Sequence, residues 1–275
     1  MRPLKPNEIL DATIENMVVK ANGSFLKLFL LAIIAGGFVG LAGGGSNMGA
    51  FNLLLDPNLY GLGRCLAGAM FSAALILIVL SGGELFTGNT LIIVGVAEKR
   101  VTVKKMLRNW VIVYIGNFIG CAALALMWQH SGLLSSGADM LGAMTVKIAA
   151  GKCNLEFLPA FLMGILCNWL VCLGVWMATG AEGFAGKIVG MFFPIWIFVT
   201  SGFEHCVANM YYVPAGIFAK VNETYVQLSG VSEAALQNLT WAGFFVNNLI
   251  PVTLGNIIGG GVCVGLAYWV AYKKA

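Results

Sequence analysis

The sequence has little charge. Asp, Glu, Lys and Arg together make up 10% of its 275 residues, whereas 59% of the residues are hydrophobic. A soluble domain carries about 25% charged residues on the surface that faces water, so this composition excludes an ordinary soluble protein. The net charge of +4 is too small to indicate a nucleic-acid partner. The composition therefore predicts one membrane unit with short connections.

Residues that hold metals and redox cofactors are also scarce. The chain has two histidines, His130 and His205, and seven cysteines, none of which forms a Cys-x-x-Cys pair. This excludes the usual ligand sets of haem, iron–sulfur clusters and redox metals. The only resemblance to a nucleophile and its base is Cys206 beside His205, and neighbouring helical residues point apart. We therefore expect no metal, no cofactor, no catalytic residue and no enzyme activity.

Long runs without charge dominate the rest of the chain. Four of them can supply the roughly 20 apolar residues that cross a bilayer, namely residues 28–55, 109–138, 157–181 and 234–272. Two further runs are interrupted by a carboxylate, residues 65–97 by Glu84 and residues 188–219 by Glu204. A carboxylate at membrane depth normally faces a protein interior or a wet cavity. The pattern predicts an all-α membrane protein with six transmembrane helices, in which spans two and five are broken.

The first residues have a different pattern. Residues 7–22 are predicted to form an amphipathic helix with Asn7 as its N-cap. Its apolar face is formed by Leu10, Ile14, Met17, Val18 and Ala21. We expect this helix, within an N-terminal segment 1–24, to lie on the cytoplasmic membrane surface. Residues 25–272 would form the six-span domain, and residues 273–275 a cytoplasmic tail.

The distribution of Lys and Arg predicts the orientation. With six spans and the N-terminus inside, twelve basic residues fall in inner segments, and four, Arg64, Lys147, Lys152 and Lys220, fall in outer segments. Because basic residues favour the cytoplasmic side, we expect both termini in the cytoplasm and a multi-pass protein of a bacterial inner membrane.

Two patterns recur along the chain. Ser81, Gly82, Glu84 and Asn89 reappear 120 residues later as Ser201, Gly202, Glu204 and Asn209, and the pattern Asn109, Gly116, Asn117, Gly120 reappears as Asn248, Gly255, Asn256, Gly259. Both recurrences, in the same order, predict a duplicated three-span unit, with repeat one at about residues 25–130 and repeat two at about 150–272. An odd number of spans inverts the second unit, so the two breaks would face one central pathway. Helix N-termini at such breaks suit small anions.

These motifs resemble a known family. Ser81-Gly82-Gly83-Glu84 followed by Leu85-Phe86-Thr87, the run from Ser201 to His205, and Pro251-Val252-Thr253-Leu254-Gly255-Asn256 are similar to the formate/nitrite transporter family. Within it, the sequence looks closer to the formate channels than to the nitrite channels. The resemblance implies a homopentamer of aquaporin-like protomers, each with its own pore.

The resemblance also implies roles for individual residues. The substrate pathway would include His205, Thr87, Asn256, Lys152 and Asn168. An outer apolar constriction would be formed by Phe71, Phe86 and Val171, with Leu85 in the same loop, and an inner one by Leu75 and Phe198. Glu84 and Glu204 would structure the loops, since a carboxylate that faced the pore would repel anions. Without the resemblance, Thr87 could be a helix cap, Asn256 a contact between helices, and Lys152 an ordinary exposed lysine.

The function that fits best is a channel for formate or a similar small monovalent weak-acid anion, in a lipid bilayer. His205 lies at membrane depth beside Glu204, and a nearby carboxylate favours a charged ring whereas burial favours a neutral one. An imidazolium could donate a proton, so that the anion crosses the apolar constriction as the neutral acid. A nitrite or hydrosulfide channel is the alternative, and a neutral-solute pore or a membrane enzyme fits less well.

Overall fold

The computed structural model describes residues 2–274, with Lys274 described by its backbone alone, and the described residues contain helices and no strand. Six helices are long and apolar enough to cross a membrane, as the sequence predicts. They are Phe25–Leu55, Tyr60–Ser81, Val103–His130, Phe157–Gly180, Gly183–Ser201 and Trp241–Lys273. Two shorter apolar helices, Phe86–Ala97 and Cys206–Ala219, complete the set.

The elements follow one another in two similar series. The first comprises α1 (Pro6–Ala21), α2 (Phe25–Leu55), α3 (Tyr60–Phe71), α4 (Ala73–Ser81), α5 (Phe86–Asn89), η1 (Thr90–Ile92), α6 (Ile93–Ala97) and α7 (Val103–His130). After η2 (Leu133–Ser135), the second comprises α8 (Met140–Cys153), α9 (Phe157–Gly180), α10 (Gly183–Ser201) and α11 (Cys206–Ala219), then α12 (Glu223–Ser229) and α13 (Glu233–Gln237). The last helix is continuous but alternates α-helical and π-helical turns through α14 (Trp241–Gly243), η3 (Phe244–Leu249), α15 (Ile250–Ile257), η4 (Ile258–Leu266), α16 (Ala267–Trp269) and η5 (Val270–Lys274).

The two interrupted runs each contain a turn that stops the helix. The helix of α4 ends at Ser81 and α5 begins at Phe86, while α10 ends at Ser201 and α11 begins at Cys206. Each turn starts with a glycine in the left-handed region, Gly82 at φ 91° and Gly202 at φ 80°. Glycine adopts this conformation without the steric cost of a Cβ. Both following helices therefore begin inside the protein.

Glycines bring neighbouring helices into close contact. The α2 helix packs against α7, and α9 packs against α15 and η4. A Cβ at Gly120 of α7 would overlap the backbone carbonyl of Ile33, and a Cβ at Gly259 would overlap that of Ile165. Backbone contact of this kind depends on a missing side chain, as is common between membrane helices.

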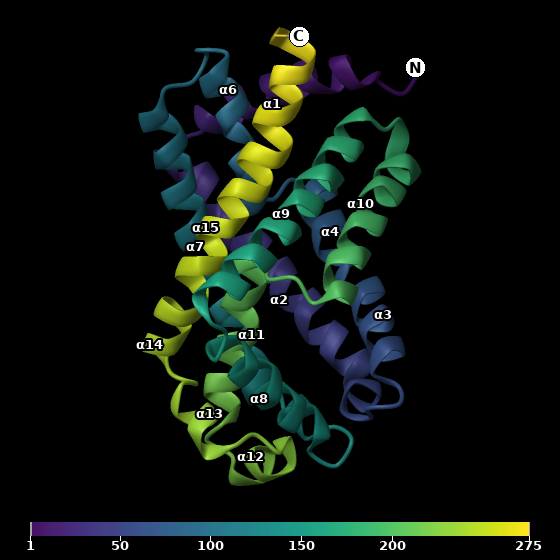
Figure 1. Cartoon of the computed structure of the whole chain (residues 1–275), viewed down its shortest axis with the longest axis vertical. Helices are drawn as coiled ribbons and strands as arrows, with labels where there is room; N and C mark the ends of the chain where they lie inside the picture. Colours follow the sequence, from purple (N-terminus) through teal and green to yellow (C-terminus); the bar gives the residue numbers. More distant parts are fainter. Residues whose placement is uncertain (1, 275) are drawn as a thin grey trace.

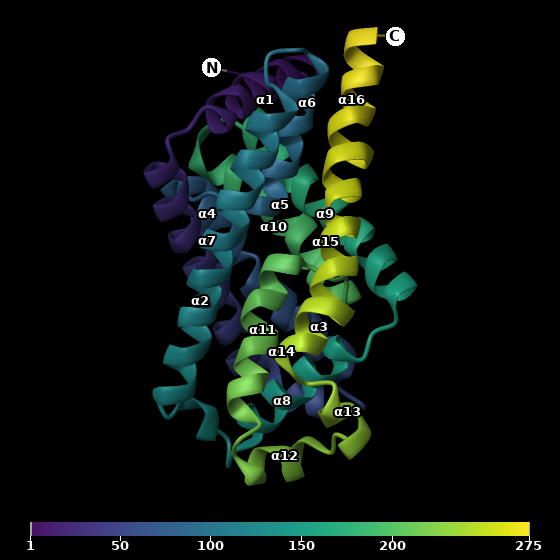
Figure 2. The same ribbon diagram turned by 90° about the vertical axis from the view of Figure 1, so that its left-hand side faces the viewer.

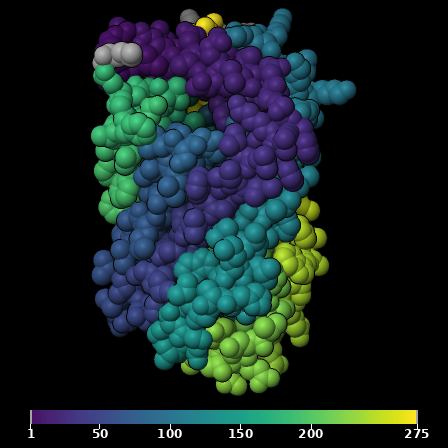
Figure 3. All heavy atoms as spheres, turned by 180° about the vertical axis from the view of Figure 1, so that it is seen from behind, coloured from purple at the N-terminus to yellow at the C-terminus, as the bar shows by residue number. Residues whose placement is uncertain are grey.

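The N-terminal helix differs from the sequence prediction in two respects. Its N-cap is Lys5, not Asn7, because Pro6 can occupy the first helical position and the Glu8 carboxylate accepts from the Lys5 N–H at 2.7 Å. Its apolar face is buried against α6, α7, η1 and α9, as the buried Leu10 and Ile14 show, and is not left open for lipid. Figure 3 shows α1 lying across one end of the molecule.

The ends of the chain lie together. Figures 1 and 2 show α1 and the C-terminal helix at one end of the molecule, and α8, α12 and α13 at the other. An even number of crossings requires this arrangement.

Candidate functional site

The first break is stabilised around the Glu84 carboxylate. Its Oε2 accepts a hydrogen bond from Asn89 Nδ2 at 2.7 Å, and its Oε1 pairs with Lys20 Nζ at 2.9 Å. The Asn89 amide also donates to Asn109 Oδ1 at 2.9 Å, and Asn109 Nδ2 donates to the Lys20 carbonyl at 3.0 Å. A buried carboxylate is tolerated when it is paired and hydrogen-bonded in this way.

The second break repeats this cluster. Glu204 Oε2 accepts from Asn209 Nδ2 at 2.7 Å, and Glu204 Oε1 pairs with Lys152 Nζ at 2.7 Å. Asn209 Nδ2 donates to Asn248 Oδ1 at 2.7 Å, and Asn248 Nδ2 donates to the Lys152 carbonyl at 3.1 Å. Each carboxylate therefore pairs with one lysine and accepts from the asparagine five residues later, and Glu204 also accepts from Asn248 Nδ2 at 3.3 Å.

Lys20 is a site residue that the sequence analysis missed. It matches Lys152 at a distance of 132 residues, and the signal is the pattern Lys20-Ala21-Asn22 against Lys152-Cys153-Asn154. The two asparagines also do the same work, since Asn22 Nδ2 donates to Val18 O and Asn154 Nδ2 donates to Ala150 O, both at 2.7 Å. Thus α1 occupies the place in the first series that α8 occupies in the second.

A second pair of asparagines holds the start of each half-helix. Asn117 Oδ1 accepts from Phe86 N and Asn256 Oδ1 accepts from Cys206 N, both at 2.9 Å. The amide of Asn117 donates to the carbonyls of Ala32 and Glu84, and that of Asn256 donates to the carbonyls of Gly164 and Glu204. Both donor hydrogens of Asn256 are used by backbone oxygens, so its geometry favours a structural contact over a donor to substrate.

His205 and Thr87 meet between the two breaks. His205 Nε2 lies 2.9 Å from Thr87 Oγ1, and Ala208 N donates to His205 Nδ1 at 2.9 Å. Because Nδ1 accepts, it carries no proton, and the neutral ring must carry its proton on Nε2. The ring therefore donates to the threonine hydroxyl. A second proton would have to displace Ala208 N–H at the positive end of α11.

Glu204 does not act on the imidazole as the sequence suggested. Adjacent residues diverge here, and the carboxylate is occupied by Lys152, Asn209 and Asn248. No bond joins Glu204 to the His205 ring among the described residues. The structure thus removes the interaction that was expected to favour a charged ring.

The backbone at Thr87 is fixed from α9. Its carbonyl accepts from Thr90 Oγ1 at 2.6 Å and from Asn168 Nδ2 at 3.2 Å, with Cys172 Sγ at 3.4 Å. Asn168 also donates to the Asn256 carbonyl at 2.7 Å. Asn168 is fully buried and connects the start of the first half-helix to α15, which fixes the backbone of Thr87.

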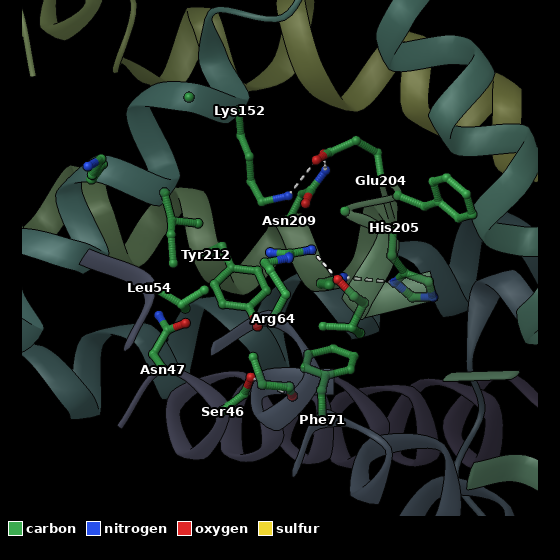
Figure 4. Close-up of a pocket in the computed structure, with 18 of the residues that line it drawn as sticks. Ser46, Asn47, Leu54, Arg64, Phe71, Lys152, Glu204, His205, Asn209 and Tyr212 are labelled. Carbon is green, nitrogen blue, oxygen red and sulfur yellow. Dashed lines mark hydrogen bonds and ion pairs between the residues drawn. The ribbon is translucent and has the colours of Figure 1, made fainter. Parts of the chain in front are cut away.

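A cavity of about 690 Å³ leads to His205 from the α8 end of the molecule. Figure 4 shows Lys152, Glu204, Asn209 and His205 in its wall, and the Lys152 Nζ lies 5.6 Å from the centre of the Tyr212 ring. We call this cavity the vestibule. Three cations, Arg64, Lys147 and Lys152, and one carboxylate, Glu204, line it, so a small anion fits its charge.

Phenylalanines line the inner part of the vestibule. The rings of Phe71 and Phe198 meet edge to face at 5.9 Å, and Phe198 stacks on His205 at 5.8 Å. The sequence analysis assigned Phe71 and Phe198 to different constrictions, whereas the structure brings them into one apolar contact beside the imidazole.

The other predicted constriction residues lie deeper or elsewhere. Phe86 contacts Trp110 and Tyr114 edge to face and lines an apolar groove between α7 and α15 rather than the vestibule. Leu85, Val171 and Leu75 are all buried, and Leu75 lies against Gly174 of α9. Among the described residues, no three His, Cys, Asp or Glu side chains gather as a metal site would require.

Comparisons with known proteins agree with this architecture. A family model described as "Formate/nitrite transporter" matches residues 7–270. The chain is 37% identical to the formate channel FocA of Escherichia coli over 98% of this chain and 95% of that protein. It is 38% identical to a probable formate transporter of Methanothermobacter thermautotrophicus over 90% of this chain and 89% of that protein. A solved structure described as a pentameric formate channel with formate bound superposes with a TM-score of 0.81, at 41% identity, covering 90% of this chain and 97% of that one.

Proposed function

The chain belongs to the formate/nitrite transporter family, and from this premise we propose that it is a membrane channel for formate or a similarly small monovalent weak-acid anion. The observation that carries the proposal is the His205–Thr87 pair, which lies between two helix breaks at the end of a cation-lined vestibule. The pair offers a hydrogen-bond donor to an oxyanion, and the apolar contact of Phe71 and Phe198 beside it excludes bare charge.

The fold assigned to this function is an inverted repeat of aquaporin-like type, assembled as a homopentamer in a lipid bilayer. The paired contacts of Asn117 with Asn256 and of Glu84 with Glu204 support the repeat. We extend repeat one to include α1, because Lys20 does for Glu84 what Lys152 does for Glu204. Native mass spectrometry of the purified protein should show five chains, and a stable monomer as the sole species would contradict the assembly.

The proposed location is a bacterial inner membrane, with both termini on its cytoplasmic side. The twelve-to-four distribution of Lys and Arg supports it. The vestibule is then the outer mouth, and α1 covers the inner mouth. Cysteine-accessibility labelling that places either end of the chain outside would contradict this orientation.

Each pathway residue has one role. Lys152, held by Glu204, attracts the anion to the vestibule, and Phe71 and Phe198 form the barrier beside His205. The Thr87 hydroxyl, which accepts from His205 Nε2–H, keeps its own hydrogen to donate to the substrate oxygen, while Asn168 and Asn256 position the two half-helices. We keep Val171, Leu75 and Leu85 as the apolar lining of the deeper passage, whereas Phe86 belongs to the groove between α7 and α15.

Proton coupling follows from the barrier. A formate ion must lose its hydration at the phenylalanines, whereas formic acid crosses a dry stretch at far lower cost. Since protonating His205 would break its bond to Ala208 N–H, we assign the proton to water in the vestibule. One proton binds one formate, the neutral acid crosses, and the same proton is released on the other side.

The test uses purified protein in liposomes with an internal pH indicator. Formate applied outside should acidify the lumen faster than in protein-free liposomes, and a panel of nitrite, hydrosulfide, acetate and lactate ranks the substrates. Uptake of formate without lumenal acidification would contradict proton coupling but would still support a formate channel. No protein-dependent flux of any weak-acid anion would overturn the function itself.

A further inference from the structure

Two polar side chains in the vestibule have no role in the pathway described above. Arg64 of α3 and Asn47 of α2 both line the cavity (Figure 4). The Arg64 guanidinium donates from Nε to the Thr200 carbonyl at 3.3 Å and from Nη2 to the Val199 carbonyl. Its Nη1 has no partner in the part of the chain that the structure describes. Arg64 therefore caps the last turn of α10 and keeps donors free on the vestibule side.

Asn47 is the second observation. Asn47 is only 5% exposed, and its side chain forms no hydrogen bond with any described residue. Its amide atoms are not among the fully buried atoms that lack a partner, so they reach the open space of the vestibule. Because Asn47 lines the vestibule, its free donors are available to a molecule in that cavity.

The charges favour an anion at this place. Lys152 is already paired with Glu204, whereas Arg64 forms no ion pair with any carboxylate of the described residues. The carbonyl end of α10 carries a partial negative charge that would repel an anion, and Arg64 covers that end with a full positive charge. Arginine also offers a planar fork of donors that matches a carboxylate.

The inner mouth lacks a counterpart. The residue 120 positions after Arg64 is Phe184, whose side chain is largely exposed. The carbonyls of Val79 and Leu80, at the equivalent end of α4, receive no side-chain donor within residues 2–273. The repeat is therefore not kept at this position, and only the outer mouth gains the extra cation.

We propose that Arg64 and Asn47 form an anion-binding subsite in the outer vestibule, which holds a small monovalent carboxylate before it reaches Lys152 and His205. The site raises the local concentration of anions at the outer mouth. The formate part of this inference rests on the proposed function, but the positive potential at Arg64 does not.

The potential is tested without transport. Ile148, which lines the same vestibule, is replaced by Cys, and its modification by an anionic and a cationic methanethiosulfonate is timed in the intact assembly. Arg64→Gln should lower the anionic-to-cationic rate ratio by roughly threefold to tenfold, the expected effect of one charge at short range. Arg64→Lys should retain the ratio. Lys220→Gln is the matched control, since Lys220 Nζ bonds to the Leu239 carbonyl and does not line the vestibule.

Binding is tested by protection. Formate should slow modification of the Ile148→Cys protein, and both Arg64→Gln and Asn47→Leu should weaken that protection. Asn47→Leu should leave the rate ratio unchanged, because it removes donors and no charge. An unchanged ratio in a correctly assembled Arg64→Gln protein overturns the electrostatic part, and equal protection in all variants overturns the subsite. Failure of the proposed function would instead be seen as absent formate flux in the unmodified protein.

Discussion

The Glu84 and Glu204 clusters are built from the same parts but serve different mouths. Each has a carboxylate, a lysine and two asparagines in matching contacts. The lysine of the second cluster faces the vestibule, whereas that of the first comes from α1. The clusters differ most at the following residue, which is Leu85 in one and His205 in the other. The shared parts therefore build the breaks, and the differences carry the function.

Replacing His205 with an apolar residue should have the largest effect on formate flux, because the second break then resembles the first. His205→Phe removes the Nε2 donor and the Nδ1 bond to Ala208 N. Because the Thr87 hydroxyl loses the bond that orients it, we expect a large loss of bidirectional formate flux in liposomes, with an intact pentamer. Any remaining flux should keep its pH dependence, since the proton comes from water. His130→Phe, at the end of α7, is the control. Wild-type rate and wild-type pH dependence in His205→Phe would make His205 structural.

Much of this arrangement could be predicted from the sequence. Charge-free runs predict the six long helices, because the bilayer sets both their length and their composition. The recurrence of Ser, Gly, Glu and Asn predicts where the helices break, since only a glycine turn and a satisfied carboxylate are stable there. The family resemblance placed His205 and Thr87 in one pathway, but it did not predict their contact, because nothing local relates residues 118 positions apart.

The missed features depend on contacts that the sequence does not display. Lys20 looked like one more cytoplasmic lysine, because its partner Glu84 is distant in sequence. The charge state of the His205 ring depends on where Glu204 points and on the Ala208 N–H. Likewise, the sequence shows that α1 has an apolar face but not that the rest of the chain covers it.

The matched asparagines give the next largest effect. Asn117→Leu and Asn256→Leu each leave a buried backbone N–H and two carbonyls without their side-chain partners. Each substitution should cost about 2–4 kcal/mol of stability, measured as a lower unfolding temperature of the detergent-solubilised pentamer. Similar losses in both variants would support equal structural roles. If the Asn256→Leu protein instead has a normal unfolding temperature and an altered anion selectivity, Asn256 contacts the substrate.

The apolar barrier gives a smaller and one-sided effect. Phe198→Ala removes the ring that contacts both Phe71 and His205, and Leu75→Ala removes a buried side chain beside α9. Each widens the dry passage, so we expect increased leak, with acetate and lactate gaining more than formate. Comparing initial fluxes of these three anions measures this change. Unchanged flux of the larger anions in both variants would mean that these side chains pack against protein or lipid.

The smallest expected effect is on the stability of the first turn of α1, compared with α8; these two helices carry Lys20 and Lys152. Glu8 is paired with Arg2 and accepts from Lys5 N, and the Arg2 hydrogen bond lowers the pKa of its carboxyl to about 2 from an ordinary value of 4.5. A lowered pKa stabilises the folded helix end above about pH 4.5, and that contribution is lost as the pH falls toward 2. Because the pair lies at the surface, water and salt screen it strongly. Near neutral pH, Glu8→Gln should therefore raise hydrogen exchange at the first turn of α1 no more than a few-fold.

The difference in exchange between the unmodified protein and Glu8→Gln should shrink between pH 4.5 and pH 2. Exchange in α8 should be the same in both proteins throughout. A difference that persists at pH 2, or one that spreads to α8, would show that Glu8 acts through its size or through global stability rather than through its charge.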